Sequence, residues 1–268
     1  MSSLFQEIQT FFISIIDWIV LVIVFTFFFF TCNVERVTIF GHTTLLPLPS
    51  EPSFAASFFL MLVHDVAPEH IPLIVTDPLT AFAVQAKLAL LLAIFFTLPV
   101  FLFRFISYLA PALHTRELRI IYALLIPLTI LFFGGVWFAY IYVAPSTLSL
   151  LYTMTGPIGV TPMLGVSEFI GMTTALLFTT GFAFTIPVFM VVLTILGAVP
   201  ASFWRTNARF AIIFFLVVSA IITPDGSGIS MLILSFPVSF LYGAGALVCS
   251  RVENTRKREV FSTSLVNK

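Results

Sequence analysis

Long uninterrupted apolar segments dominate this sequence and limit the folds that the chain can adopt. Apolar residues make up 60% of its 268 residues, and charged residues only 9%. A soluble domain carries about 25% charged residues, because polar surface has to meet the water. The composition therefore indicates an integral membrane protein. Since the apolar runs are continuous rather than alternating, we expect an all-α fold whose backbone polar groups are satisfied within each helix.

Six apolar segments are candidates for crossing a hydrocarbon core of about 30 Å. We expect one polytopic membrane domain over residues 1–268, with spans at about 11–31, 78–106, 120–144, 166–196, 210–222 and 229–248. Pro145 is expected to close the third span and Pro187 to kink the fourth. Residues 32–77, rich in proline, are expected to form an extramembrane loop with one short interfacial or packed helix at 54–63. Residues 249–268 are expected to form a basic tail.

Loop charges predict the orientation of these helices. The two loops and the tail on one side hold nine Lys and Arg residues, whereas the loops on the other side hold only Arg36. Because positively charged loops stay on the cytoplasmic side, the count predicts that both termini lie on the cytoplasm or matrix side.

The placement of histidine and cysteine residues argues against redox and metal chemistry. All four histidines fall in expected loops, so no pair could ligate a haem between helices, and no catalytic Ser, His and Asp set converges within the spans. Cys32 and Cys249 are expected on opposite sides of the membrane, where they cannot form a disulfide. We expect no cofactor, no metal and no enzymatic activity. A net charge of zero gives no indication of a nucleic-acid partner.

Few ionisable residues are expected at membrane depth, where they are costly and are functional candidates by default. Asp17 lies in the first span, either in a hydrogen bond within the bundle or in a working role. Lys87 lies in the second span, either extending its ammonium group to the interface or serving a polar cavity. Glu168 opens the fourth span. Asp225 lies between the last two spans, either as a turn residue that caps the next helix or as a functional residue.

Several sequence blocks occur in an order and spacing that resemble a known family. The most specific is the run Tyr-Leu-Ala-Pro-Ala-Leu at residues 108–113, followed by Glu117 and Arg119. Gly-Phe-Ala-Phe-Thr-Ile-Pro-Val at 181–188 and Thr-Pro-Asp at 223–225 come later. From residue 76 onward the chain resembles the TatC family, the multi-spanning receptor subunits of the twin-arginine protein translocase. The short fifth and sixth spans fit the same family.

The resemblance implies a function and a set of site residues. A TatC subunit binds the twin-arginine signal peptide of a folded cargo protein at its inner face, and small single-span TatA/TatB-like subunits then help to pass the cargo across. Self-association and contact with the lipid bilayer are also implied. By position, Glu117 and Glu7 match carboxylates that receive the signal's guanidinium groups, and Tyr108 matches an aromatic position. Pro111 and Arg119 are further polar or structural candidates in this loop.

Two departures from the family pattern accompany the resemblance, and one different function class competes with it. The N-terminal segment keeps Glu7 but lacks the basic residues of the family motif, and Thr185 stands where the family usually has a glutamate. The alternative is a secondary transporter of a small solute, but the paired broken helices and repeats of transporters are not found. The Phe-rich, Lys-poor composition favours an organelle-encoded protein of the mitochondrial inner membrane. A bacterial plasma membrane and a thylakoid are the other possibilities.

Overall fold

Helices dominate the computed structural model, which describes residues 2–39, 42–49, 52–68, 72–75, 77–109, 115–153, 163–223 and 228–266. The helical elements are α1 (Ser2–Thr31), α2 (Phe54–Val66), α3 (Pro78–Leu109), α4 (Thr115–Phe138), the π-helical turn η2 (Ala139–Val143), α5 (Ala144–Thr153), α6 (Val166–Ile195), α7 (Ala201–Thr206), α8 (Ala208–Ile222) and α9 (Ile229–Val266). The strands are β1 (Cys32–Ile39), β2 (His42–Pro49), β3 (Leu73–Ile74) and β4 (Leu164–Gly165).

Apolar helices lie at all six predicted span positions. Within the described ranges, four of them are long and apolar enough to cross a membrane: Pro78–Arg104, Tyr122–Thr153, Val166–Ile195 and Ile229–Thr255. Two shorter apolar helices, Ile15–Thr31 and Ala208–Ile222, correspond to the first and fifth predicted spans. The predicted all-α membrane fold is confirmed. The exact span bounds and the side on which the termini lie stay predictions.

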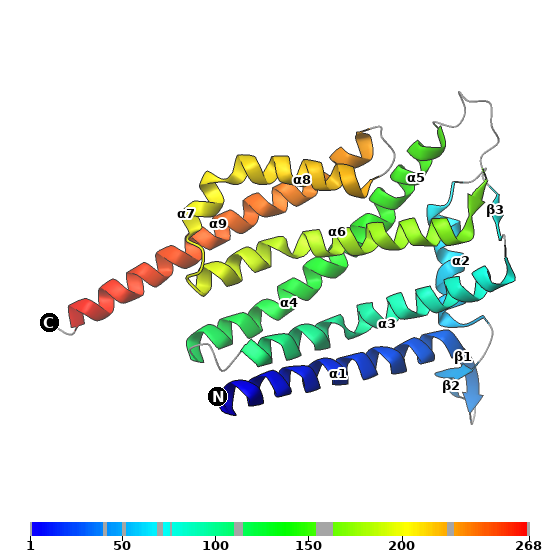
Figure 1. The fold of residues 1–268 in the computed structure, drawn as a ribbon, viewed down its shortest axis with the longest axis horizontal. Helices are drawn as coiled ribbons and strands as arrows, with labels where there is room; N and C mark the ends of the chain where they lie inside the picture. The colour runs from blue at the N-terminus through cyan, green and yellow to red at the C-terminus, as the bar shows by residue number, and fades with distance from the viewer. Residues whose placement is uncertain are drawn as a thin grey trace. The chain divides into compact units, whose positions relative to one another are not determined.

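The chain divides into two compact units. The first comprises residues 1–112 and 160–174, and the second comprises 113–159 and 175–268, so that α6 begins in the first unit and continues into the second. In the first unit α1 lies along α3, and α2 contacts both helices (Figure 1). The ring of Phe30 contacts that of Phe82 edge to face, and the ring of Trp18 contacts that of Phe101, so the two helices are antiparallel.

The predicted loop at residues 32–77 contains more regular structure than expected. β1 and β2 form an antiparallel hairpin, in which Cys32 pairs with Pro49 and Ile39 with His42. The predicted short helix is α2, whose start is capped by Ser53 accepting a hydrogen bond from the backbone N–H of Ala56 at 3.3 Å. β3 then pairs in parallel with β4 immediately before α6.

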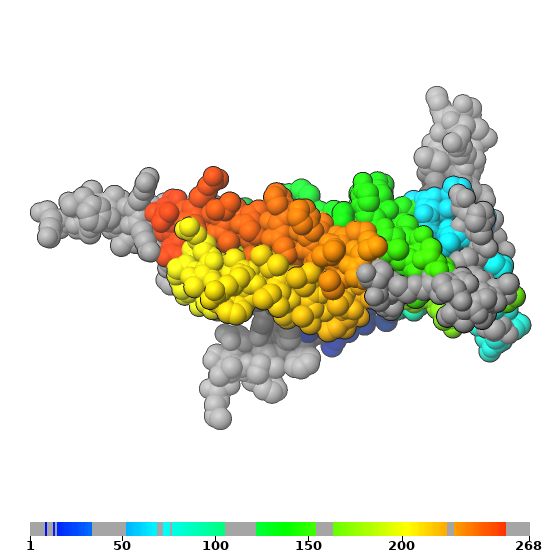
Figure 2. Space-filling view, turned by 90° about the horizontal axis from the view of Figure 1, so that it is seen from above, coloured from blue at the N-terminus to red at the C-terminus, as the bar shows by residue number. Residues whose placement is uncertain are grey.

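In the second unit, the helix through the third predicted span does not end at Pro145, contrary to expectation. It passes through the π-helical turn η2 and continues as α5 to Thr153. Pro145 comes directly after the π-helical turn, where the backbone N–H of Ala144 donates to the carbonyl of Ala139 five residues earlier, so the regular hydrogen-bond ladder is already interrupted where the proline lacks its N–H. α8 and α9 form an antiparallel hairpin, and Figure 2 shows α8 lying along α9 on one face of this unit.

Two glycines allow α4 and α6 to pack closely in the second unit. A Cβ atom on Gly135 would lie 2.8 Å from Cβ of Phe184, and one on Gly181 would lie 2.9 Å from Cε2 of Phe132. Neither distance is sterically acceptable, so the helices could not approach this closely with any side chain at these positions. Small residues serve the same purpose at many helix contacts in membranes.

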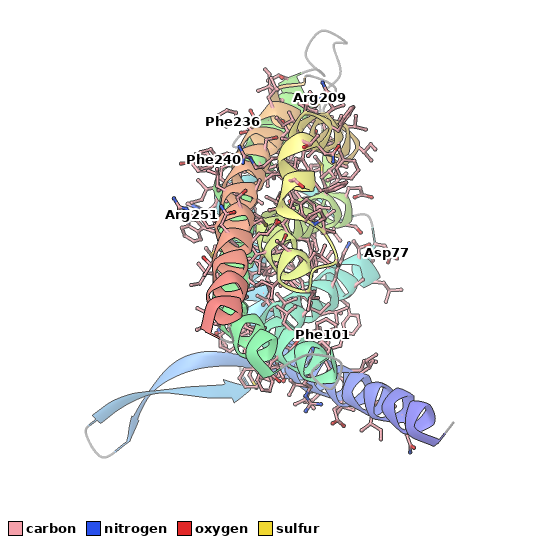
Figure 3. The ribbon with its side chains drawn as sticks, turned by 90° about the vertical axis from the view of Figure 1, so that its left-hand side faces the viewer. Asp77, Phe101, Arg209, Phe236, Phe240 and Arg251 are labelled. Atoms are coloured by element: carbon pink, nitrogen blue, oxygen red, sulfur yellow. The ribbon has the colours of Figure 1, made fainter. Side chains whose placement is uncertain are left out.

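Large apolar side chains cover much of the outer surface. On α9, Phe236 and Phe240 are 77% and 71% exposed, and Figure 3 shows both pointing away from the neighbouring helices. A water-facing surface of this kind would favour aggregation. The same surface is suited to contact with lipid chains, in agreement with the membrane fold.

Candidate functional site

An ion pair joins the middle of α1 to the last turns of α3 in the first unit. Nη1 of Arg104 donates a hydrogen bond to Oδ2 of Asp17 at 2.9 Å. Beside the pair, the rings of Trp18 and Phe101 lie with their centroids 4.5 Å apart (Phe101 is labelled in Figure 3). Asp17 therefore has a partner on the adjacent helix. Of the two roles considered for Asp17, this geometry agrees with the hydrogen bond within the bundle.

The residues predicted to bind a signal peptide lie on three helices. Glu7 belongs to the first turns of α1, and Tyr108 to the last turn of α3. Because α1 and α3 are antiparallel neighbours, these two segments share one end of the first unit. Glu117 and Arg119 belong to the first turns of α4. The side chains of these four residues lie outside the described part of the structure, as does Pro111, so their predicted roles remain proposals.

Lys87 lies on α3 with an exposed side chain, and its ammonium group rests against the beginning of α6. A Cβ atom on Gly171 would lie 3.4 Å from Nζ of Lys87, so the absence of a side chain there makes room for the ammonium group. Glu168 precedes Gly171 by three residues on α6 and is exposed. Among the described residues no ion pair involves Lys87.

The position at which the family pattern has a glutamate is filled by a locally satisfied hydroxyl group. Thr185 is buried, and its Oγ1 donates a hydrogen bond of 2.6 Å to the backbone carbonyl of Phe182 one turn earlier. The side chain therefore offers no charge at this point of α6. Asp225, the other predicted polar residue of this unit, lies outside the described residues.

A hydrogen-bond network that the sequence reasoning missed fixes α7 between α6 and α9. Nε1 of Trp204 donates to Oγ1 of Thr194 at 3.0 Å, and the hydroxyl group of Tyr242 donates to the backbone carbonyl of Trp204 at 2.9 Å. The backbone N–H of Ala201, at the start of α7, donates to Oε2 of Glu253 at 2.7 Å. This network determines the course of the short connection between α6 and α8, which carries Arg205.

Little in the described structure suggests a redox or metal centre. Cys32 and Cys249 are both free thiols. Nδ1 of His64 lies 2.7 Å from Oδ1 of the adjacent Asp65 on α2. No group of three or more His, Cys, Asp or Glu side chains that could hold a metal occurs in the ranges that the structure covers.

The fold defines a polytopic α-helical membrane protein. The family TatC, Sec-independent protein translocase protein, matches residues 4–237. The chain belongs to this family, and the resemblance deduced from its sequence blocks is confirmed.

Individual relatives and solved structures agree with this assignment. The Sec-independent protein translocase protein TatC of Cenarchaeum symbiosum is 32% identical over 233 residues, which cover 87% of this chain and 88% of the relative. The TatC-like protein ycf43 of Porphyra purpurea is 32% identical over 167 residues, covering 62% of this chain and 65% of the relative. A crystal structure of the twin-arginine translocase receptor TatC superposes with a TM-score of 0.69 at 23% identity, covering 91% of this chain and 98% of that one, and so shares the fold.

Proposed function

We propose that this chain is the receptor subunit of a twin-arginine translocase, which binds the signal peptide of a folded cargo protein and takes part in moving that protein across the membrane without itself catalysing a reaction. The observation that carries the proposal is the family match over residues 4–237, joined to a fold that agrees with TatC along 91% of the chain. The transporter alternative has no comparable support.

The proposed binding site comprises Glu117, Tyr108 and Glu7. Glu117 follows the Ala-Pro-Ala-Leu sequence at residues 110–113 and belongs to the first turn of α4. A carboxylate there can accept a guanidinium group through two parallel hydrogen bonds, a geometry that lysine does not reproduce. Glu7 supplies a carboxylate on α1, the helix that lies along α3. Tyr108 contributes an aromatic surface in the last turn of α3.

The proposal extends to partners and membrane. Small single-span TatA/TatB-like subunits, cargo proteins with twin-arginine signals, other copies of this chain and the lipid bilayer are the proposed partners, with no cofactor or metal. The chain is a multi-pass integral membrane protein. We place it in the mitochondrial inner membrane, because 33 phenylalanines with few lysines fit translation from a T-rich organelle genome.

Photocrosslinking tests the site. A precursor protein with an intact twin-arginine signal, carrying a photoreactive residue beside the two arginines, is presented to membranes that contain the full chain. Glu117→Gln should abolish crosslinking at unchanged protein abundance, and Glu117→Asp should retain part of it, because the charge survives while the reach shortens. Glu168→Gln, which removes a carboxylate at the start of α6, is the matched control and should crosslink normally. Normal crosslinking by Glu117→Gln would remove Glu117 from the site.

A further inference from the structure

The Asp17–Arg104 ion pair joins a carboxylate to a guanidinium group, the two chemical groups that would also meet when the proposed site binds an arginine of a signal peptide. Its two members lie 87 residues apart in the chain, and the guanidinium and carboxylate groups meet at 2.9 Å. The side chains are 55% exposed for Asp17 and 38% for Arg104, so an incoming group can reach the carboxylate.

The pair lies on the same two helices as two of the proposed binding residues, Glu7 and Tyr108. Arg104 precedes Tyr108 by four residues, about one turn of α3. Asp17 follows Glu7 by ten residues, about 15 Å along α1. Glu7 and Asp17 are the two acidic residues of α1. A signal peptide that passes from the inner surface into the membrane would therefore meet Asp17 after Glu7.

Exchange of one guanidinium group for another on Asp17 requires no new chemistry. The incoming arginine would form the same charge-assisted hydrogen bond that Arg104 forms. Arg104, once released, can extend its long side chain towards the interface, as arginines near helix ends do. The rings of Trp18 and Phe101 also contact each other beside the pair, so the packing of α1 against α3 does not depend on the ion pair alone.

We propose that Asp17 is a second carboxylate for the twin-arginine signal, and that Arg104 competes with the signal for it. This proposal rests on the proposed function and adds a specificity determinant to the same site. Only Glu7 of the family's N-terminal motif is present in this chain. Asp17 would supply a second carboxylate on the same helix. Arg104 would occupy Asp17 until the guanidinium group of a signal peptide displaces it. The ammonium group of a lysine would displace Arg104 less well, because it cannot form two parallel hydrogen bonds with the carboxylate.

The test measures binding of a synthetic signal peptide with two consecutive arginines and a photoreactive side chain to the full chain in lipid vesicles. Asp17→Asn should weaken apparent affinity, and Arg104→Gln should strengthen it, each by about fivefold, the change expected for one exposed ion pair. These opposite signs distinguish competition from a structural role, which would give two changes in the same direction or none. Asp77→Asn, which removes a carboxylate at the far end of α3, should change nothing.

A graded series keeps the proposal testable should Asp17→Asn accumulate poorly. The affinity for the signal peptide should then rise in the order wild type, Arg104→Lys, Arg104→Gln, because the interaction of residue 104 with Asp17 weakens in that order. A flat series, or one in which both substitutions weaken binding, would overturn the proposal. If Glu117→Gln abolishes binding while the residue 104 series is flat, the receptor function stands and only this inference fails. If wild-type protein binds no signal peptide, the proposed function itself fails.

Discussion

The backbone N–H of Ala201 donates a hydrogen bond of 2.7 Å to Oε2 of Glu253, although the two residues are 52 positions apart. Through this contact the polar end of α9 caps α7 and determines the path of the connection between α6 and α8. Tyr242 and Thr194 reinforce the same connection through Trp204. The connection carries Arg205, so its order can be followed with a protease that cleaves after arginine.

Glu253→Ala should therefore loosen the α6–α8 connection. Loss of a hydrogen bond to a charged acceptor should lower stability by about 2 kcal/mol, and trypsin should cleave at Arg205 several times faster than in the wild type. Thermal unfolding in detergent and timed proteolysis measure the two effects. Asn254→Ala, at the next position on an exposed part of α9, is the control. Equal cleavage rates in both variants would show that Glu253 does not hold α7.

Gly135→Ala should destabilise the contact between α4 and α6. The added methyl group would lie 2.8 Å from Cβ of Phe184 and 2.9 Å from the backbone carbonyl of Thr180, and overpacking of this kind typically costs about 1–3 kcal/mol. Gly134→Ala adds the same atom where nothing lies within 4 Å and should leave the melting temperature unchanged or raised. A Gly135→Ala protein as stable as Gly134→Ala would contradict the close packing.

Lys87→Met should be tolerated if the ammonium group only extends along α6 to the interface. The described structure gives Lys87 no ion-pair partner, so its removal leaves no charge unpaired there. Abundance and assembly can be compared by native gel electrophoresis of solubilised membranes. Lys87→Asp is the contrasting variant, because a short acidic side chain cannot reach the interface and should lower abundance. Loss of assembly in Lys87→Met would instead assign Lys87 to a polar contact with a partner.

Cysteine labelling should find Ser50 and Arg205 on opposite sides of the membrane. The prediction follows from the excess of Lys and Arg in the loops expected inside. Single cysteines replace these residues in a chain whose native Cys32 and Cys249 are changed to Ser and Ala, and an impermeant maleimide is added from one side. The reagent should label position 50 from the outer side and position 205 only after permeabilisation. Labelling of both from the same side would overturn the topology.

The sequence predicted those parts of the fold that depend on local composition. Apolar runs located α6 at Val166–Ile195, against an expected span of 166–196, because a continuous apolar segment needs no tertiary information to be recognised. The helix through Pro145 was predicted to end too early. The π-helical turn that precedes Pro145 lets the helix continue past this proline, and it carries no recognisable sequence signal.

Contacts between distant residues could not be predicted in the same way. Asp17 was recognised as a costly charge in the first span, but its pairing with Arg104 depends on α1 and α3 being neighbours. Opposite charges near the inner ends of the first two spans were the one available signal. Glu253 lies among the basic residues of the predicted tail, where nothing in the sequence indicates its contact with Ala201. The β1–β2 hairpin depends on pairing across a turn, which a proline-rich segment does not suggest.

The central claim is that this chain reads paired arginines in a signal peptide, and the choice between arginine and lysine tests it most directly. Two precursors, identical except that one carries Arg-Arg and the other Lys-Lys, are presented to membranes containing the full chain, and the photocrosslinked product is quantified. Because lysine cannot form the two parallel hydrogen bonds to a carboxylate, we expect a clear adduct with Arg-Arg and little or none with Lys-Lys. Equal adducts with the two precursors, or none with either, would contradict the account.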